Sequence, residues 1–241
     1  MSVLDRRTII TGLPAIGAAL SLAGCAARMA EMAMEKSPPS LPSLEPSFEQ
    51  SPATMYGPID GERFPIPAVK LSATDVKFLR KTVPYATAEA PGTIVVDPAQ
   101  HYLYFVQRGG YALRYGVGVG GEEFGWSGEA SVHDKQEWPD WYPPKEMIER
   151  RPELKKSVSE LQSGLGVPGG SGNPLGARAL YLWQGNKDTL YRIHGTIEPW
   201  TIGRSVSSGC IRMINQDVID LYQRAPVGTK VVVLPTRVSQ L

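Results

Sequence analysis

Cysteine and histidine are scarce in this chain, with 2 Cys and 3 His among 241 residues. These numbers are too small for a multi-cysteine zinc site or for a disulfide framework. Neither sign of charge is in excess, since 25 Lys and Arg stand against 24 Asp and Glu. A nucleic-acid-binding domain normally has a basic face, so we expect no nucleic-acid partner.

Glycine and proline, in contrast, are plentiful. The 25 Gly and 21 Pro favour loops and strands over long helices. The hydrophobic fraction of 42% is high enough to bury a core and argues against general disorder. The length suits one ordinary domain with tails, or at most two small domains.

Residues 1–24 have the pattern of an export signal. Arg6 and Arg7 precede an uncharged, mostly apolar stretch over 8–23 that is too short for a stable membrane span. The stretch ends in Leu22-Ala23-Gly24-Cys25, which resembles a bacterial lipobox, in which the cysteine is lipidated. The arginine pair also resembles part of a twin-arginine signal. We expect a periplasmic or cell-envelope protein anchored by a lipid on Cys25. Plain secretion with a chance cysteine, or a buried N-terminal helix, are the alternatives.

Residues 25–91 are expected to form a proline-rich linker and a short arm. Eight prolines fall between residues 37 and 67, and such a segment favours an extended spacer over a regular ladder. The alternative is an irregular arm that lies on the domain surface, with 64–67 docking there. A short helix is predicted over 72–80, with Ser72 as its N-cap.

The pattern changes after residue 91 to short β-runs, which predict a mostly β domain over 92–234 and a tail over 235–241. Strands are predicted at 93–96, 101–107, 112–119, 179–183, 190–194 and 230–234. One helix is predicted to begin at Asn215 as its cap, with Val218, Leu221 and Tyr222 as its apolar stripe.

Residues 122–176 are rich in Trp, Pro and Gly and are read as one long loop. A loop of this length in a compact domain is often functional. It either forms a lid or is an insertion that packs its aromatic side chains on the domain. The aromatic residues concerned are Trp126, Trp138, Trp141 and Tyr142.

The chemistry is concentrated between 194 and 212, in two short motifs: His194-Gly195-Thr196 and Ser207-Ser208-Gly209-Cys210-Ile211-Arg212. Once Cys25 is lipidated, Cys210 is the one thiol that remains. A thiol is a good nucleophile as the thiolate, which requires a base or a positive charge nearby. His194 lies sixteen residues upstream at the end of a predicted strand, and the connection can fold back to bring the two side chains together.

The residues around Cys210 suit acyl transfer. Gly209 permits a tight turn that exposes backbone N–H groups, which with the Cys210 N–H would form an oxyanion hole. Arg212 would lie on the same side as Cys210 in an extended segment. There it can favour the thiolate or hold a substrate carboxylate. Singly, such residues are more often structural, but together they favour catalysis.

These motifs resemble the signature of the L,D-transpeptidase catalytic domain (YkuD-like) family, in which His-Gly is followed after a gap by Ser-x-Gly-Cys-x-Arg. The resemblance extends over 92–234, including Asn173-Pro174-Leu175-Gly176-Ala177-Arg178. It implies a β-sandwich or barrel with one or two short helices and a long lid-like loop. Two departures stand out. Ser208 replaces a second His found in many members, and the loop around Trp126 lacks the usual Thr-Pro-x-Gly-type turn.

The resemblance also implies roles for the site residues. Cys210 would be the nucleophile, His194 its general base, and the Gly195 carbonyl would orient the imidazole. Gly209 and Arg212 would support the oxyanion and the site, and Ser207 would brace the loop. The expected substrate-binding residues are Ser208, Trp126 and Tyr191.

The implied enzyme is a peptidoglycan L,D-transpeptidase, a cysteine acyltransferase of cell-wall organisation and cell shape. It would cleave a tetrapeptide stem at its L,D bond through a thioester. The acceptor would be an amine, giving a 3–3 cross-link, lipoprotein attachment or D-amino-acid exchange, or else water. No metal or organic cofactor is needed, and we expect a monomer. The alternatives are a non-catalytic peptidoglycan-binding module and an exported acyltransferase of sortase type, although sortases separate His from Cys by a far longer chain.

Overall fold

The structure is a computed structural model that describes residues 51–121, 126–143, 145–150, 152–207 and 209–236. The predicted signal over 1–24 and the lipidation site Cys25 lie outside these residues. Within the described part of the chain, no helix has the length and apolar character needed to cross a bilayer.

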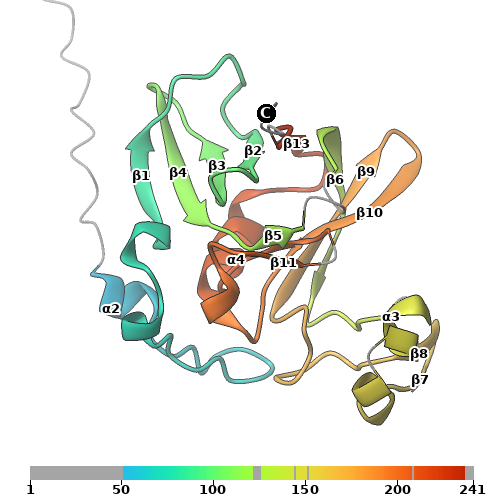
Figure 1. Cartoon of the computed structure of the whole chain (residues 1–241). Coiled ribbons are helices and arrows are strands. Elements are labelled where there is room, and N and C mark those ends of the chain that lie inside the picture. Colours follow the sequence, from blue (N-terminus) through green and yellow to red (C-terminus); the bar gives the residue numbers. More distant parts are fainter. Residues whose placement is uncertain (1–50, 122–125, 144, 151, 208, 237–241) are drawn as a thin grey trace, which may run out of the picture. The chain divides into compact units, whose positions relative to one another are not determined.

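A mixed, nine-stranded sheet forms the centre of the described part (Figure 1). Its order is β1 (Lys81–Pro84), β4 (Tyr111–Gly116), β3 (Tyr102–Val106), β2 (Ile94–Asp97), β13 (Lys230–Val233), β6 (Gly128–Glu137), β9 (Arg178–Gln184), β10 (Lys187–His194) and β12 (Ile211–Arg212). The β2–β13 and β10–β12 pairs are parallel and the others are antiparallel. The prediction of a mostly β fold is confirmed.

The sheet turns back on itself next to β12. Gly118, just beyond β4, exchanges both backbone hydrogen bonds with Arg212, at 2.9 and 2.8 Å. The following β5 (Val119–Gly120) pairs with β11 (Ser205–Ser207) in a small two-stranded sheet. A side chain at Gly118 would press against the Thr201 carbonyl, so glycine is required at this close approach.

Alternation along the strands builds the core. Leu180 and Leu182 of β9 are fully buried, whereas the intervening Tyr181 faces the other side of the sheet. Val218 and Leu221 of helix α4 (Asn215–Arg224) join the same hydrophobic cluster. The predicted apolar stripe of this helix is therefore confirmed for its two buried members, and Tyr222 is partly buried against the cluster.

The predicted cap of α4 is wrong. Ile214 is the N-cap residue and contributes no side-chain cap bond. Asn215 is the first residue of the helix, and its Oδ1 accepts a hydrogen bond from the Ala177 backbone N–H at 3.0 Å. Asn215 therefore ties the helix start to the loop that precedes β9.

The reading of 122–176 as one long loop is also wrong. The ten-residue strand β6 lies within it and pairs with both β13 and β9. Only two of its residues, Ala130 and Val132, are buried apolar residues, so its hydrophobic signal is weak. The remainder contains α3 (Lys145–Arg150), the 3₁₀ helix η4 (Pro152–Lys156) and a hairpin of β7 (Ser159–Leu161) and β8 (Gly164–Gly166). Figure 1 shows α3, β7 and β8 gathered away from the large sheet.

Residues 51–84, called the arm below, lie on the domain. The arm begins with α2 (Pro52–Met55) and ends with β1, which pairs with β4. Tyr56 and Ile66 are almost fully buried. The helix predicted over 72–80 is wrong. Two 3₁₀ turns stand there, η1 (Leu71–Ala73) and η2 (Val76–Phe78), and Phe78 rather than Val76 is buried. The second half of the predicted linker is thus a docked segment.

Candidate active site

The parallel pairing of β10 and β12 brings the two predicted reactive residues together. His194 lies opposite Arg212, and Cys210 is two residues before Arg212. Side chains two residues apart on a strand share a face, and register partners in neighbouring strands point the same way. The segments that carry Cys210 and His194 therefore lie side by side at the β10–β12 pair, as the predicted fold-back of the chain between them requires.

His194 is held in a single orientation. Its Nδ1 donates a hydrogen bond to the Gly195 carbonyl oxygen at 2.6 Å, the contact that the family resemblance implies. A neutral imidazole has one N–H, so this bond leaves Nε2 as the basic nitrogen. Burial lowers the pKa of His194 to about 4, while the Gly195 and Leu175 backbones act in the opposite direction. The ring is therefore neutral near pH 7 and able to accept a proton.

The peptide after His194 is fixed from several sides. The Gly195 N–H donates to the Arg178 carbonyl at 3.0 Å, and the Met213 N–H donates to the His194 carbonyl at 2.8 Å. Asn215 packs so closely on Gly195 that a side chain at Gly195 would collide with its Oδ1. Glycine after the histidine is thus a packing requirement, and it lets helix α4 approach the site.

Cys210 is half-buried and directly follows Gly209. Gly209 has φ +117°, a conformation that strongly favours glycine, as the predicted tight turn requires. Burial raises the pKa of the Cys210 thiol, and the Arg192 backbone and the Arg192 and Arg212 charges oppose this shift only in part. Burial favours a neutral thiol next to a neutral imidazole.

Arg212 is tied to the loop that follows the His194 motif. Its Nη1 forms an ion pair with Glu198 Oε2 at 3.2 Å. The Glu198 carbonyl in turn accepts the Thr201 hydroxyl at 2.7 Å, in the short η5 turn (Pro199–Thr201). Arg212 thus braces residues 196–201 as well as acting on Cys210. Glu198 had no recognisable motif in the sequence.

The other predicted site residues are in different places. Trp126 packs against Tyr191 with ring centroids 5.4 Å apart, and both lie on the main core cluster next to the site. Trp138 instead packs edge-on against Phe64 of the arm at 5.1 Å. Ser207 ends β11, and Ser208 lies outside the described residues. Trp141 pairs through its backbone with Val167, and the Tyr142 hydroxyl donates to Asp140, so neither residue takes part in these two ring contacts.

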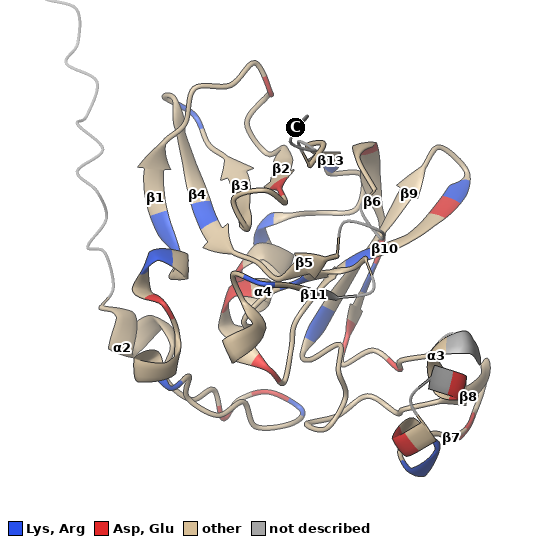
Figure 2. Cartoon of the chain, in the orientation of Figure 1, with Lys and Arg blue, Asp and Glu red and all other residues tan. Residues whose placement is uncertain are grey.

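Sequence reasoning gave no role to Arg192. It precedes His194 by two residues, so the alternation of a strand already places both on one face. Arg192 also directly precedes Ile193, whose register partner Ile211 directly follows Cys210. Its Nη2 contacts Asp188 Oδ2 at 3.2 Å, and its guanidinium lies over the Tyr181 ring. Figure 2 shows basic positions along β10.

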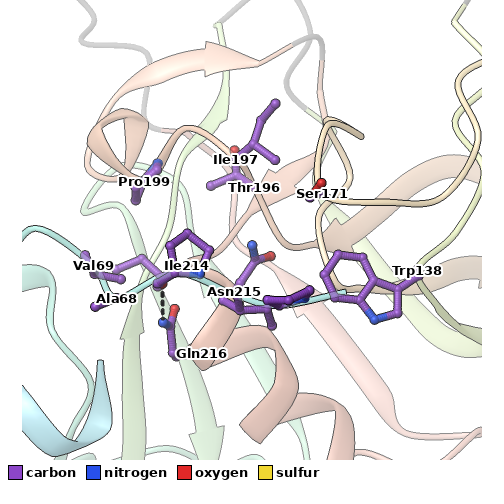
Figure 3. A pocket seen from close by; sticks show the side chains of 13 residues that line it. Ala68, Val69, Trp138, Ser171, Thr196, Ile197, Pro199, Ile214, Asn215 and Gln216 are labelled. Atoms are coloured by element: carbon purple, nitrogen blue, oxygen red, sulfur yellow. Dashed lines mark hydrogen bonds between the residues drawn. The ribbon is translucent and has the colours of Figure 1, made fainter. Parts of the chain in front are cut away.

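A pocket lies beside the site, between the arm and the loop after His194 (Figure 3). Its lining residues do not include His194 or Cys210, but Thr196 and Ile197 form one wall. Gln216 closes part of it by donating hydrogen bonds to the arm carbonyls of Gly57 and Pro67, at 3.0 and 3.1 Å. Among the described residues, no group of three or more His, Cys, Asp or Glu is arranged to hold a metal ion.

Comparison with known proteins gives the family. The L,D-transpeptidase catalytic domain model (YkuD) matches residues 91–233, more than half of the chain. The chain belongs to the L,D-transpeptidase catalytic domain family. The family and enzyme class inferred from the His and Cys motifs are confirmed at this level.

Curated relatives of this family have the same name. The probable L,D-transpeptidase ErfK/SrfK of Salmonella typhimurium is 36% identical over 144 residues, which are 58% of this chain and 43% of that protein. The probable L,D-transpeptidase YbiS of Escherichia coli is 34% identical over 141 residues, 57% of this chain and 43% of that protein. The chain thus spans less than half the length of these relatives.

Solved structures were also compared. A structure from Brucella melitensis, named a probable carnitine operon oxidoreductase CaiA, is 52% identical and covers 66% of this chain and 96% of that one, with a TM-score of 0.43. Its name differs from that of the matched family. An L,D-transpeptidase from Mycobacterium smegmatis is 17% identical and covers 61% of this chain and 59% of that one, with a TM-score of 0.44.

Proposed function

We propose that this protein is an exported peptidoglycan L,D-transpeptidase with Cys210 as nucleophile and His194 as general base. The observation that carries the proposal is the β10–β12 register, which pairs His194 with Arg212, two residues after Cys210. The Nδ1 bond to Gly195 supports the role of His194, because it leaves Nε2 basic. Membership of the family supplies the reaction class.

In the first half-reaction, the substrate is a tetrapeptide stem that ends in a D-amino acid. The Cys210 sulfur attacks the carbonyl carbon of the L-centre of the third residue while His194 Nε2 accepts the thiol proton. The backbone N–H groups of Gly209 and Cys210 stabilise the tetrahedral oxyanion. The C–N bond then breaks, the protonated imidazole gives its proton to the leaving amine, and a thioester remains on Cys210.

The second half-reaction reverses these steps with a new nucleophile. An acceptor amine attacks the thioester carbon and loses a proton to His194. The C–S bond breaks and the thiol regains the proton, which leaves an amide bond to the acceptor. An amine from another stem or a lipoprotein gives a cross-link or an attachment, and water gives hydrolysis. A neutral resting thiol and imidazole suit this order of steps, because their charges form only when the thiol attacks the substrate carbonyl.

The remaining site residues have supporting roles in the proposal. Arg212 fixes the loop after His194 through Glu198, and Ser207 braces the approach to Gly209. Trp126 and Tyr191 provide an aromatic surface for the stem peptide, and Ser208 provides a hydroxyl group. The enzyme would act in the periplasm as a monomer, anchored by a lipid on Cys25.

Muropeptide analysis tests the proposal. The purified protein is incubated with a defined disaccharide-tetrapeptide, with and without acceptor stems. We expect release of the terminal D-amino acid and a tripeptide-linked product. A protein that binds the stem but leaves it intact would instead support the wall-binding alternative.

A further inference from the structure

We propose that Arg192 is a specificity residue that binds the terminal carboxylate of the leaving D-amino acid. This inference rests on the proposed function and adds a recognition site next to Cys210.

The first argument is the position of Arg192. Arg192 directly precedes Ile193, and Cys210 directly precedes Ile211, the register partner of Ile193. The Arg192 backbone is also a hydrogen-bond partner of the Cys210 thiol. Neighbouring strands lie about 4.8 Å apart, so residues that flank a register pair are close to one another. The carboxylate of the leaving residue is three bonds from the attacked carbon, so it lies within a similar distance of the sulfur. A long side chain at 192 therefore has the reach to meet that carboxylate.

The second argument is that the guanidinium is held in place. Asp188 contacts Nη2 at 3.2 Å, and the guanidinium carbon lies 4.8 Å from the centroid of Tyr181. The Arg192 side chain is only 21% exposed. A guanidinium has five N–H donors in a planar fork. Some of these donors can bind Asp188 while others bind a substrate carboxylate. An arginine that is already oriented loses little conformational entropy when it binds.

The third argument is electrostatic. The charge of Arg192 acts on both Cys210 and His194, lowering the pKa of each by less than burial shifts it. Arg212, the other cation near the thiol, is paired with Glu198 on the side of residues 196–201. Arg192, which is paired with Asp188, supplies positive charge on the β9 side of Cys210, where Tyr181 is its register partner, and Asp188 offsets part of that charge.

The test compares two donors that differ only at the C-terminus. One tetrapeptide stem ends in a free carboxylate and the other in a carboxamide, and kcat/KM is measured from release of D-alanine or D-alaninamide. A charge-assisted hydrogen bond to a carboxylate changes kcat/KM by about ten- to hundred-fold. We expect Arg192→Gln to lower kcat/KM for the acid donor by about that factor and to change the amide donor by less than about three-fold.

The amide donor is the internal control, because any effect of Arg192 through the Cys210 thiol acts on both donors alike. Lys187→Gln removes an exposed charge from the same strand and should leave the acid-to-amide ratio unchanged. Arg192→Lys should restore part of the ratio. An equal loss for both donors, or no loss, would overturn the assignment. If kcat/KM instead depends on whether the side-chain carboxylate of the third stem residue is amidated, the assignment would also be overturned. If the wild-type protein releases neither product, the proposed function has failed.

Discussion

At the scale of single residues, burial decides the protonation states of the site. It lowers the pKa of His194 to about 4 and raises the pKa of the Cys210 thiol. Both shifts disfavour charge, so in the proposed mechanism the thiol gives its proton to His194 during attack. The sequence predicted the two residues correctly because the motif names them. It could not predict their charge, since the burial that shifts both pKa values is set by the folded chain and not by the motif.

This view of the site predicts the pH dependence of Cys210 alkylation. Iodoacetamide reacts with the thiolate, whose population is small until the pH approaches the raised pKa of Cys210. The alkylation rate of the wild-type protein should therefore keep rising through pH 9. Cys210→Ser supplies the background rate. A plateau that begins below pH 7 would show a preformed thiolate–imidazolium pair and contradict the neutral resting site.

At the scale of elements, the arm is part of the catalytic domain although it lies outside the matched residues 91–233. Glu62 binds Arg178 through two hydrogen bonds, at 2.6 and 2.9 Å, and accepts the Trp138 indole N–H at 3.1 Å. Arg178 belongs to β9, and its carbonyl holds the Gly195 N–H. The arm therefore supports the strand and the peptide that position His194.

The arm contact predicts a difference between two ion pairs. The Arg178 and Glu62 side chains are 7% and 15% exposed. Glu62→Gln should lower the free energy of unfolding by about 2 kcal/mol, because it leaves the buried Arg178 guanidinium with only the more distant Glu137 carboxylate, at 3.8 Å. Asp75→Asn breaks a pair whose members are 61% and 50% exposed, and should leave the free energy of unfolding nearly unchanged. Urea denaturation measures both. Equal small losses would show that the arm contributes little to stability.

The strands and the arm also mark how far sequence patterns reach. Runs such as 93–96 and 230–234 are continuous and apolar, and they form β2 and β13. The strand β6 was missed because charged residues fill its exposed face and Pro and Trp follow it. The docking of the arm depends on Tyr56, Ile66 and Glu62 finding partners more than 70 residues away. No local pattern specifies such partners.

At the scale of the whole molecule, two buried groups give opposite dependences of stability on pH. Burial lowers the pKa of His194 from 6.5 to about 4, so on acidification the unfolded chain takes up a proton that the folded chain refuses. Burial raises the pKa of Asp217 from 3.8 to about 7, even though Arg80 and the Tyr56 hydroxyl oppose the shift. On acidification, Asp217 therefore takes up its proton at a higher pH in the folded chain than in the unfolded chain. Each pKa shift changes the free energy of unfolding by roughly 3 to 4 kcal/mol over its pH range.

The signs follow from proton uptake. Between pH 6.5 and 4 His194 makes stability fall as the pH falls, and between pH 7 and 4 Asp217 makes it rise. The two effects largely cancel in the wild-type protein. Asp217→Asn removes one of them, so its unfolding free energy should fall on acidification from pH 7 to 4.5 more steeply than that of the wild type. Glu160→Gln, at an exposed carboxylate on β7, should follow the wild type. Parallel curves for Asp217→Asn and the wild type would contradict this account.

The central claim is that Cys210 carries the acyl group. Its most direct measurement is intact-mass spectrometry of the protein after rapid quenching with a tetrapeptide donor. The account predicts that the wild-type protein gains the mass of the donor minus the terminal D-amino acid, on Cys210, and that folded Cys210→Ala gains none. Release of the D-amino acid by wild-type protein with no adduct on Cys210, or undiminished release by Cys210→Ala, would contradict it.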